Sequence, residues 1–141
     1  MFLGEYRHSI DEKGRLTVPS KFRGELSVGL VVTRGLDRNL TLYPLASWQE
    51  LYDNIMKQPL SDNDVRAFRR RVFSGATDLK PDKQGRVVLP QYLREFAGIN
   101  GEVILTGMGN HLEIWHPSTW DKERDLIEDN EAVTRWDDIG I

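Results

Sequence analysis

One nine-residue pattern occurs twice in this chain of 141 residues. Residues 11–19 read DEKGRLTVP and residues 82–90 read DKQGRVVLP, so Asp-x-x-Gly-Arg-x-x-x-Pro recurs with an offset of 71 residues. The similarity extends beyond the pattern, because Phe22 and Arg23 match Leu93 and Arg94 at the same offset. An internal repeat of this kind predicts two copies of one structural unit within a single chain.

Each copy spans about 50 residues, which is too few to bury an adequate core alone. We therefore expect one compact pseudo-symmetric domain in which the two copies share a core. The expected divisions are residues 1–52 for the first repeat, 53–73 for a helical connector, 74–124 for the second repeat and 125–141 for an acidic C-terminal tail.

The turn residues and the apolar spacing predict the same order of elements in both copies. Asp11 with Gly14, and Asp82 with Gly85, stand at the first and fourth positions of type I turns. Each turn joins two strands, and a proline ends the second strand and precedes a short helix. The expected strands are 6–10, 15–18, 29–33, 39–43, 102–106 and 111–115, and the expected short helices are 20–25 and 91–97, with a connecting helix at 63–73.

A longer helix is expected after the last strand of each copy. In the first copy Ser47 begins a capping box that Glu50 completes. An apolar stripe follows at Trp48, Leu51, Tyr52, Ile55 and Met56. In the second copy Ser118 is the expected cap of a helix with a weaker stripe. Strands and helices of this order predict an α+β fold.

Composition restricts the class of protein. The hydrophobic content of 39% and charged content of 29% are typical of a globular domain, and no apolar run reaches the ~20 residues of a membrane span. The N-terminal segment does not resemble a signal peptide, and the absence of cysteine fits a cytoplasmic protein. Residues 121–141 hold eight acids and three bases, a net −5 within the chain's −3, which leaves +2 for residues 1–120.

Sequence signals for catalysis, metal or cofactor binding are poor. Gly107 and Gly109 follow a strand, but Leu112 stands where a dinucleotide-binding loop has its third glycine. His111 and His116 are five residues apart along a strand and should point to opposite faces. We therefore expect no enzyme, no cofactor, no metal site and no small-molecule substrate.

Arg15 and Arg86 are the strongest candidates for function. Turn geometry accounts for Asp11, Gly14, Asp82 and Gly85, but a type I turn does not require arginine after its glycine. Arginine suits bidentate contact with guanine and with phosphate. Nucleic-acid contact and ion pairing with the turn aspartate are both open, and the two can coexist if the aspartate holds the arginine in a reading pose.

Further candidates for DNA contact lie on or near the turns. Lys13, Lys83 and Gln84 stand at the turn tips and could touch phosphate or a base edge. Arg7, Lys21, Arg23 and Arg94 are weaker candidates, for which a solvated surface position is the simpler interpretation. The run Arg69–Arg71 favours a surface or subunit contact over DNA.

The two patterns, each within a strand–turn–strand–helix unit, resemble the swapped-hairpin units of AbrB-type (SpoVT-AbrB) regulators. Two such units in one chain, opening MFLGEYRHSIDEKGR, resemble the MraZ family from Met1 to about Trp120. The resemblance implies a pseudo-two-fold, double-psi or swapped-hairpin β-barrel built from two tandem repeats and flanked by short helices.

The resemblance also implies a function. It suggests a sequence-specific DNA-binding transcriptional regulator, usually a repressor, of a division and cell-wall gene cluster that includes its own promoter. Such a protein would bind short direct repeats in double-stranded DNA as a ring-shaped homo-oligomer, in the cytoplasm at the nucleoid and without a membrane. Arg15 and Arg86 would read the DNA. The alternative is a structural module that assembles through its helices without binding DNA.

Overall fold

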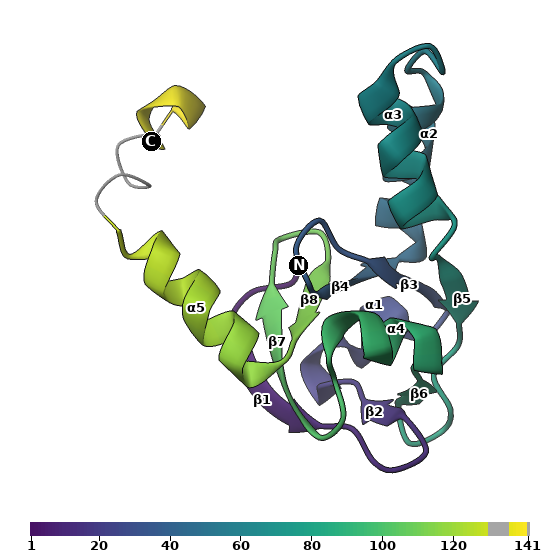
Figure 1. The fold of residues 1–141 in the computed structure, drawn as a ribbon. Coiled ribbons are helices and arrows are strands. Elements are labelled where there is room, and N and C mark those ends of the chain that lie inside the picture. Colours follow the sequence, from purple (N-terminus) through teal and green to yellow (C-terminus); the bar gives the residue numbers. More distant parts are fainter. Residues whose placement is uncertain (130–135, 141) are drawn as a thin grey trace.

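The computed structural model describes residues 1–129 and 136–140 and has an α+β fold (Figure 1). Its strands are β1 (Glu5–Ser9), β2 (Arg15–Thr17), β3 (Leu30–Arg34), β4 (Leu40–Pro44), β5 (Thr77–Leu79), β6 (Arg86–Val88), β7 (Glu102–Gly107) and β8 (Leu112–Trp115). Its α-helices are α1 (Arg23–Leu26), α2 (Leu45–Met56), α3 (Asn63–Phe68), α4 (Gln91–Ala97) and α5 (Pro117–Ile127). The predicted strands are confirmed to within one residue at each end.

The first strand of each repeat pairs with the other repeat. β1 pairs antiparallel with β7, and β5 pairs antiparallel with β3. The six-stranded order β1-β7-β8-β4-β3-β5 therefore stays the same when every strand is exchanged for its counterpart in the other copy. β2 and β6 form a separate two-stranded ribbon, again with one strand from each repeat. The two repeats are thus interleaved and do not stand side by side.

The strands do not close into the expected barrel. β1 and β5 lie at the two ends of the six-stranded order, and no pairing within the described residues joins them. Each ribbon strand has only three residues, and a proline follows two positions after the strand ends. Proline has no N–H to donate to a neighbouring strand. A bridge from Ile10 to Leu16 connects the ribbon to the residue just after β1. The described residues therefore confirm the α+β class and show no closed barrel.

The core lies between the sheet, the ribbon and the short helices, and it includes residues of both repeats. Phe2 and Phe22, both 1% exposed, have ring centroids 5.0 Å apart, and Leu93 of the second repeat is fully buried in the same cluster. Leu16 faces Val87 across the ribbon, and both side chains belong to this cluster. Burial of each such side chain contributes about 1.5–3 kcal/mol, so both copies depend on the same apolar contacts.

Two helix starts differ from the prediction. α2 begins at Leu45, directly after Pro44, so Ser47 lies inside the first turn and no side chain caps the helix. Proline ends β4 and already has the φ of −63° that suits the residue before a helix, which overrides the capping-box pattern. In the second copy the cap is His116, whose Nδ1 accepts the N–H of Ser118 at 3.0 Å. The short helix α4 is as predicted, with Gly98 at φ 67° as its C-terminal residue.

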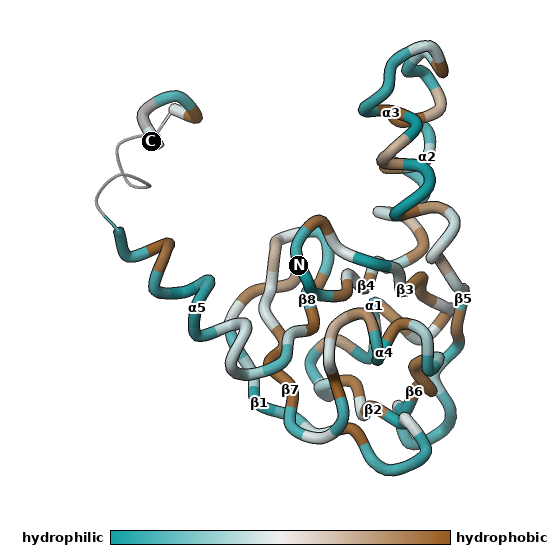
Figure 2. Tube along the Cα trace, viewed as in Figure 1, coloured by the Kyte–Doolittle hydropathy of each residue, from teal (hydrophilic) through white to brown (hydrophobic). Residues whose placement is uncertain are grey.

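Three helices extend from the body. α2 and α3 form a projecting antiparallel pair, and α5 leaves the body on the other side (Figure 1). A π-helical segment (Arg69–Phe73) continues α3, so the predicted helix over 63–73 is confirmed. Apolar residues concentrate in the body, while α5 is mainly hydrophilic (Figure 2). The expected buried stripe of α2 is only half covered, since no residue of this helix is fully buried. Within the described residues no helix has the length and apolar character to cross a membrane.

The expected tail lies partly outside the described residues. Residues 125–127 complete α5, and residues 136–139 form a short 3₁₀ turn.

Candidate nucleic-acid interface

The first turn holds Arg15 through Asp11. The turn is closed by the N–H of Gly14, which donates to the carbonyl of Asp11 at 3.0 Å. One carboxylate oxygen of Asp11 accepts the backbone N–H groups of Lys13 and Arg15, each at 2.9 Å. The other accepts Nε of Arg15 at 2.6 Å. One aspartate therefore shapes the turn and also fixes the direction of the arginine.

The second turn repeats this geometry. Asp82 accepts the backbone N–H groups of Gln84 and Arg86 and, through its other oxygen, Nε of Arg86, all at 2.9 Å. Here Nη2 of Arg86 also donates to Oε1 of Gln84 at 3.1 Å. In both turns the aspartate occupies Nε, which leaves terminal guanidinium nitrogens to bind other acceptors.

Both turn aspartates are held in the charged form. The backbone N–H of Arg15 lowers the pKa of Asp11 below its ordinary value, and the Arg15 side chain adds to this. The N–H and side chain of Arg86 lower the pKa of Asp82 in the same way. The ion pairs are exposed, so each contributes little to stability and acts mainly to orient the arginine.

The ribbon brings the two arginines to one face. Arg15 lies opposite Val88, and Thr17 lies opposite Arg86, so the arginines are diagonal neighbours on adjacent strands. Diagonal positions of an antiparallel pair are about 7–8 Å apart. Their face is opposite to that of the buried Leu16 and Val87, and the two arginine side chains are 33% and 32% exposed. Fixed guanidinium groups at this spacing can contact two neighbouring positions on one polyanion.

Each turn is also tied to the other repeat. The N–H of Leu89 donates to the carbonyl of Gly14, and the N–H of Val18 donates to the carbonyl of Gly85, both at 2.8 Å. Arg94 crosses beneath the first turn and donates from Nε to the carbonyl of Leu89 at 2.9 Å. Arg23 does the same beneath the second turn, donating to Val18 at 3.2 Å. These contacts fix the positions of the two turns relative to one another.

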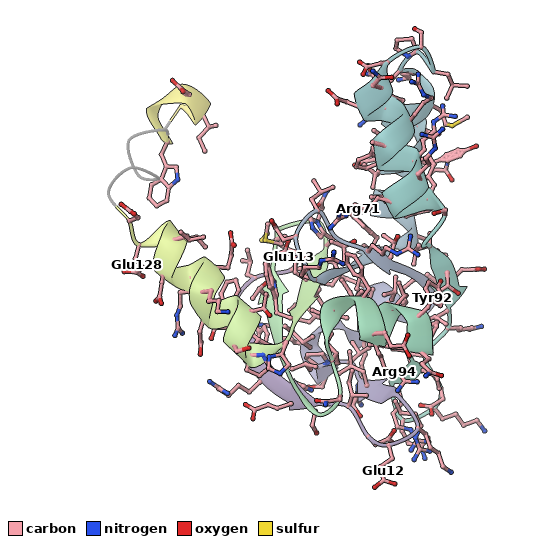
Figure 3. The ribbon with its side chains drawn as sticks, viewed as in Figure 1. Glu12, Arg71, Tyr92, Arg94, Glu113 and Glu128 are labelled. Atoms are coloured by element: carbon pink, nitrogen blue, oxygen red, sulfur yellow. The ribbon has the colours of Figure 1, made fainter. Side chains whose placement is uncertain are left out.

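The structure shows contacts of Arg23 and Arg94 that the sequence analysis did not include. Both were interpreted as weaker surface candidates, yet both lie against a turn glycine of the other repeat. Their recurrence at the offset of 71 residues was the signal that could have identified them. Figure 3 shows Glu12 on the first turn, at the end of the body opposite the α2–α3 projection, with Arg94 nearby.

The structure places the remaining candidates at different distances from this face. Lys13, Lys83 and Gln84 are exposed on the turns. Arg7 is on β1, where it forms an ion pair with Glu102. His111 stacks on Tyr43, with centroids 4.7 Å apart, and burial lowers its pKa. In the described part of the chain no three His, Asp or Glu side chains are close enough to hold a metal ion.

We predict that Gly85→Ala destabilises the fold. Gly85 has φ 76°, and an added Cβ would lie 2.5 Å from Nε of Arg23. Strain of this kind costs about 1–3 kcal/mol, so thermal unfolding followed by circular dichroism should have a lower midpoint. The matched control is Gly24→Ala in α1, where a Cβ meets nothing within 4 Å and stability should stay equal or rise. Equal midpoints for the two variants would contradict the strain expected at Gly85.

The chain is similar to proteins of a known family. The family model described as "MraZ protein, putative antitoxin-like" matches this chain twice, over residues 1–71 and 72–135. Proteins named "Transcriptional regulator MraZ" are similar over most of their length. The one from Herpetosiphon aurantiacus is 50% identical over 129 residues (92% of this chain, 90% of that protein), and the one from Syntrophomonas wolfei is 51% identical over 120 residues (85% and 84%). The one from Clostridium tetani is 41% identical over 142 residues, which cover both chains completely.

Proposed function

The chain belongs to the MraZ family of transcriptional regulators, and we propose that it regulates transcription by binding double-stranded promoter DNA through the ribbon face. The observation that supports this proposal is the pair of aspartate-held arginines on adjacent strands, one from each repeat. Arginine reads guanine O6 and N7 as a bidentate donor, and a held guanidinium loses less entropy on binding.

Charge distribution supports the same face. The two turns and the residues clasped beneath them carry six cationic side chains (Lys13, Arg15, Arg23, Lys83, Arg86 and Arg94) against three carboxylates (Asp11, Glu12 and Asp82). A local excess of positive charge attracts DNA phosphates even though the chain as a whole is −3.

One ribbon face offers few phosphate contacts, and so we propose that several act together. A ring-shaped homo-oligomer would place successive faces on short direct repeats and gain affinity through effective concentration. Its targets would be a division and cell-wall gene cluster and its own promoter, where it would act as a repressor in the cytoplasm at the nucleoid. Lys13, Lys83, Gln84 and Arg7 would supply supporting contacts.

Salt dependence tests the DNA-binding proposal. Fluorescence anisotropy of a labelled duplex from the protein's own upstream region should show saturable binding, with a scrambled duplex of equal length as control. The logarithm of the binding constant should fall linearly with the logarithm of the salt concentration. The slope should be about −0.9 for each phosphate contacted. Absence of binding at low salt would contradict the proposal and leave a module that only assembles.

A further inference from the structure

Three arginines surround the aromatic ring of Phe96 on α4. The guanidinium carbons of Arg34, Arg38 and Arg71 lie 5.9, 4.8 and 5.1 Å from the ring centroid of Phe96. We call this set the Phe96 arginine cluster. Cation–π contact stabilises each arginine individually, but it does not remove the repulsion among three positive charges.

The cluster is fixed in place by carbonyl groups and forms no ion pair with the described carboxylates. Nε of Arg71 donates to the carbonyl of Gly35 at 2.7 Å, and Nη1 of Arg34 donates to the carbonyl of Arg71 at 3.2 Å. Arg38 is exposed. Over residues 1–129 and 136–140, none of the three guanidinium groups forms an ion pair with a carboxylate. Carbonyl acceptors hold the arginines without neutralising them, so the cluster suits an anionic partner.

The repeat does not explain the cluster. In the second copy Thr106 and Asn110 stand at the positions of Arg34 and Arg38, and in the first copy Glu25 stands at the position of Phe96. The fold therefore forms this arrangement once and builds the equivalent position without it. Because the cluster breaks the pseudo-symmetry of the two repeats, it makes the surface of one repeat different from the surface of the other.

The same chain carries a surface of opposite charge. Asp121 and Asp125 of α5 and Glu128, the helical residue that caps its C-terminal end, follow one another at i, i+4 and i+7, which places them on one face. We call this face the acidic stripe. All three residues are exposed, and within the described part of the chain the one ion pair that involves them joins Asp121 to Arg124 of the same helix, at 3.2 Å. The stripe is therefore accessible to a cationic partner.

The two surfaces lie far apart within one chain. α5 leaves the body on the side opposite to α2 and α3, and Glu128 and Arg71 are widely separated in Figure 3. Arg71 and the turn residue Glu12 also lie at opposite ends of the body in this view. The cluster therefore lies away from the face that we propose for DNA. The acidic helix of another copy suits it better than DNA does.

We propose that the Phe96 arginine cluster of one copy binds the acidic stripe of the next copy. This contact joins two different surfaces, and such heterologous contacts generate rings when the rotation closes. The inference rests on the proposed function, because it supplies the contact that would order the ring, while the turn arginines would read the DNA.

Charge reversal tests the contact without DNA. Arg38→Glu alters the exposed member of the cluster, and Asp125→Arg with Glu128→Arg reverses most of the stripe. In sedimentation velocity each variant alone should form a smaller species than wild type, with association weakened tenfold or more. Lys80→Glu, an exposed substitution outside both surfaces with the same charge change as Arg38→Glu, should sediment like wild type. Circular dichroism should show all variants to be folded.

Mixing the two altered proteins provides the decisive measurement. Arg38→Glu leaves the cluster net positive, because Arg34 and Arg71 remain, and the altered stripe is also net positive, so a mixed pair keeps one original contact and loses the other. The mixture should therefore contain a two-chain species that neither protein forms alone, whereas a chain with all three substitutions should stay small. A wild-type monomer, an Arg38→Glu protein of unchanged size, or a mixture without a two-chain species would overturn the inference.

DNA binding by the same variants separates this inference from the proposed function. If Arg38→Glu keeps its size but loses DNA affinity, the cluster contacts DNA, and the inference is wrong while the function stands. If wild type assembles by the charge contact but binds no DNA, the proposed function fails and the interface stands.

Discussion

We expect that replacing Arg15 and Arg86 together by alanine strongly weakens the proposed specific binding to the protein's own promoter and leaves the chain folded. Each bidentate arginine–guanine contact discriminates by about 1–3 kcal/mol, so loss of both should weaken specific binding by about 30-fold or more. The fold should be retained, because the side chains are about one-third exposed and their ion pairs contribute roughly 0–1 kcal/mol. Gel shift on the upstream region measures the first effect, and thermal unfolding measures the second.

Two control proteins separate reading from charge. Arg15→Lys with Arg86→Lys keeps both positive charges but loses the planar fork, so salt-dependent binding to any duplex should remain while preference for the promoter disappears. Lys57→Ala with Lys122→Ala removes two charges outside the ribbon, one just after α2 and one on α5, and should retain the promoter shift. Full specific binding by the double alanine protein would show that the turn arginines only shape the turns.

The repeat made much of this fold predictable. Asp, Gly and Pro act locally, so the turn at Gly14, the strand end near Pro19 and the helix end at Gly98 could be placed from a few neighbouring residues. The exchange of β1 and β5 between repeats could not be derived from spacing, because pairing partners distant in sequence are chosen by the shared core. Closure of the strands into a barrel also depends on pairing between distant segments, and no such closure is seen in the described residues.

The candidate site was predictable where its contacts are local in sequence. The Asp11–Arg15 and Asp82–Arg86 pairs join residues four positions apart, and a repeat makes such local pairs visible. The contacts of Arg23 with the second turn join distant segments, so only the structure shows why its position recurs. The Phe96 arginine cluster has no counterpart in the other copy, and an argument based on repetition could not detect it.

Leu16→Ala provides the test of a single shared core and the largest expected loss of stability. Leu16 is 1% exposed and faces Val87 of the other repeat across the ribbon. Truncation of a buried leucine costs about 2–5 kcal/mol through lost burial and the cavity left behind. Because the hydrophobic core includes side chains from both repeats, the protein should unfold in one cooperative transition, and its midpoint should fall. Hydrogen exchange should lose protection equally in β3 and β4 of the first repeat and in β7 and β8 of the second.

The matched control is Val88→Ala on the same ribbon. Val88 is 52% exposed on the opposite face, beside Arg15, so its truncation should change stability by less than about 1 kcal/mol. If Leu16→Ala lowered protection in β3 and β4 while β7 and β8 kept wild-type protection, each repeat would have its own core. The interleaved pairing of β1 with β7 and of β5 with β3 argues against that outcome, because neither repeat retains its first strand when the other unfolds.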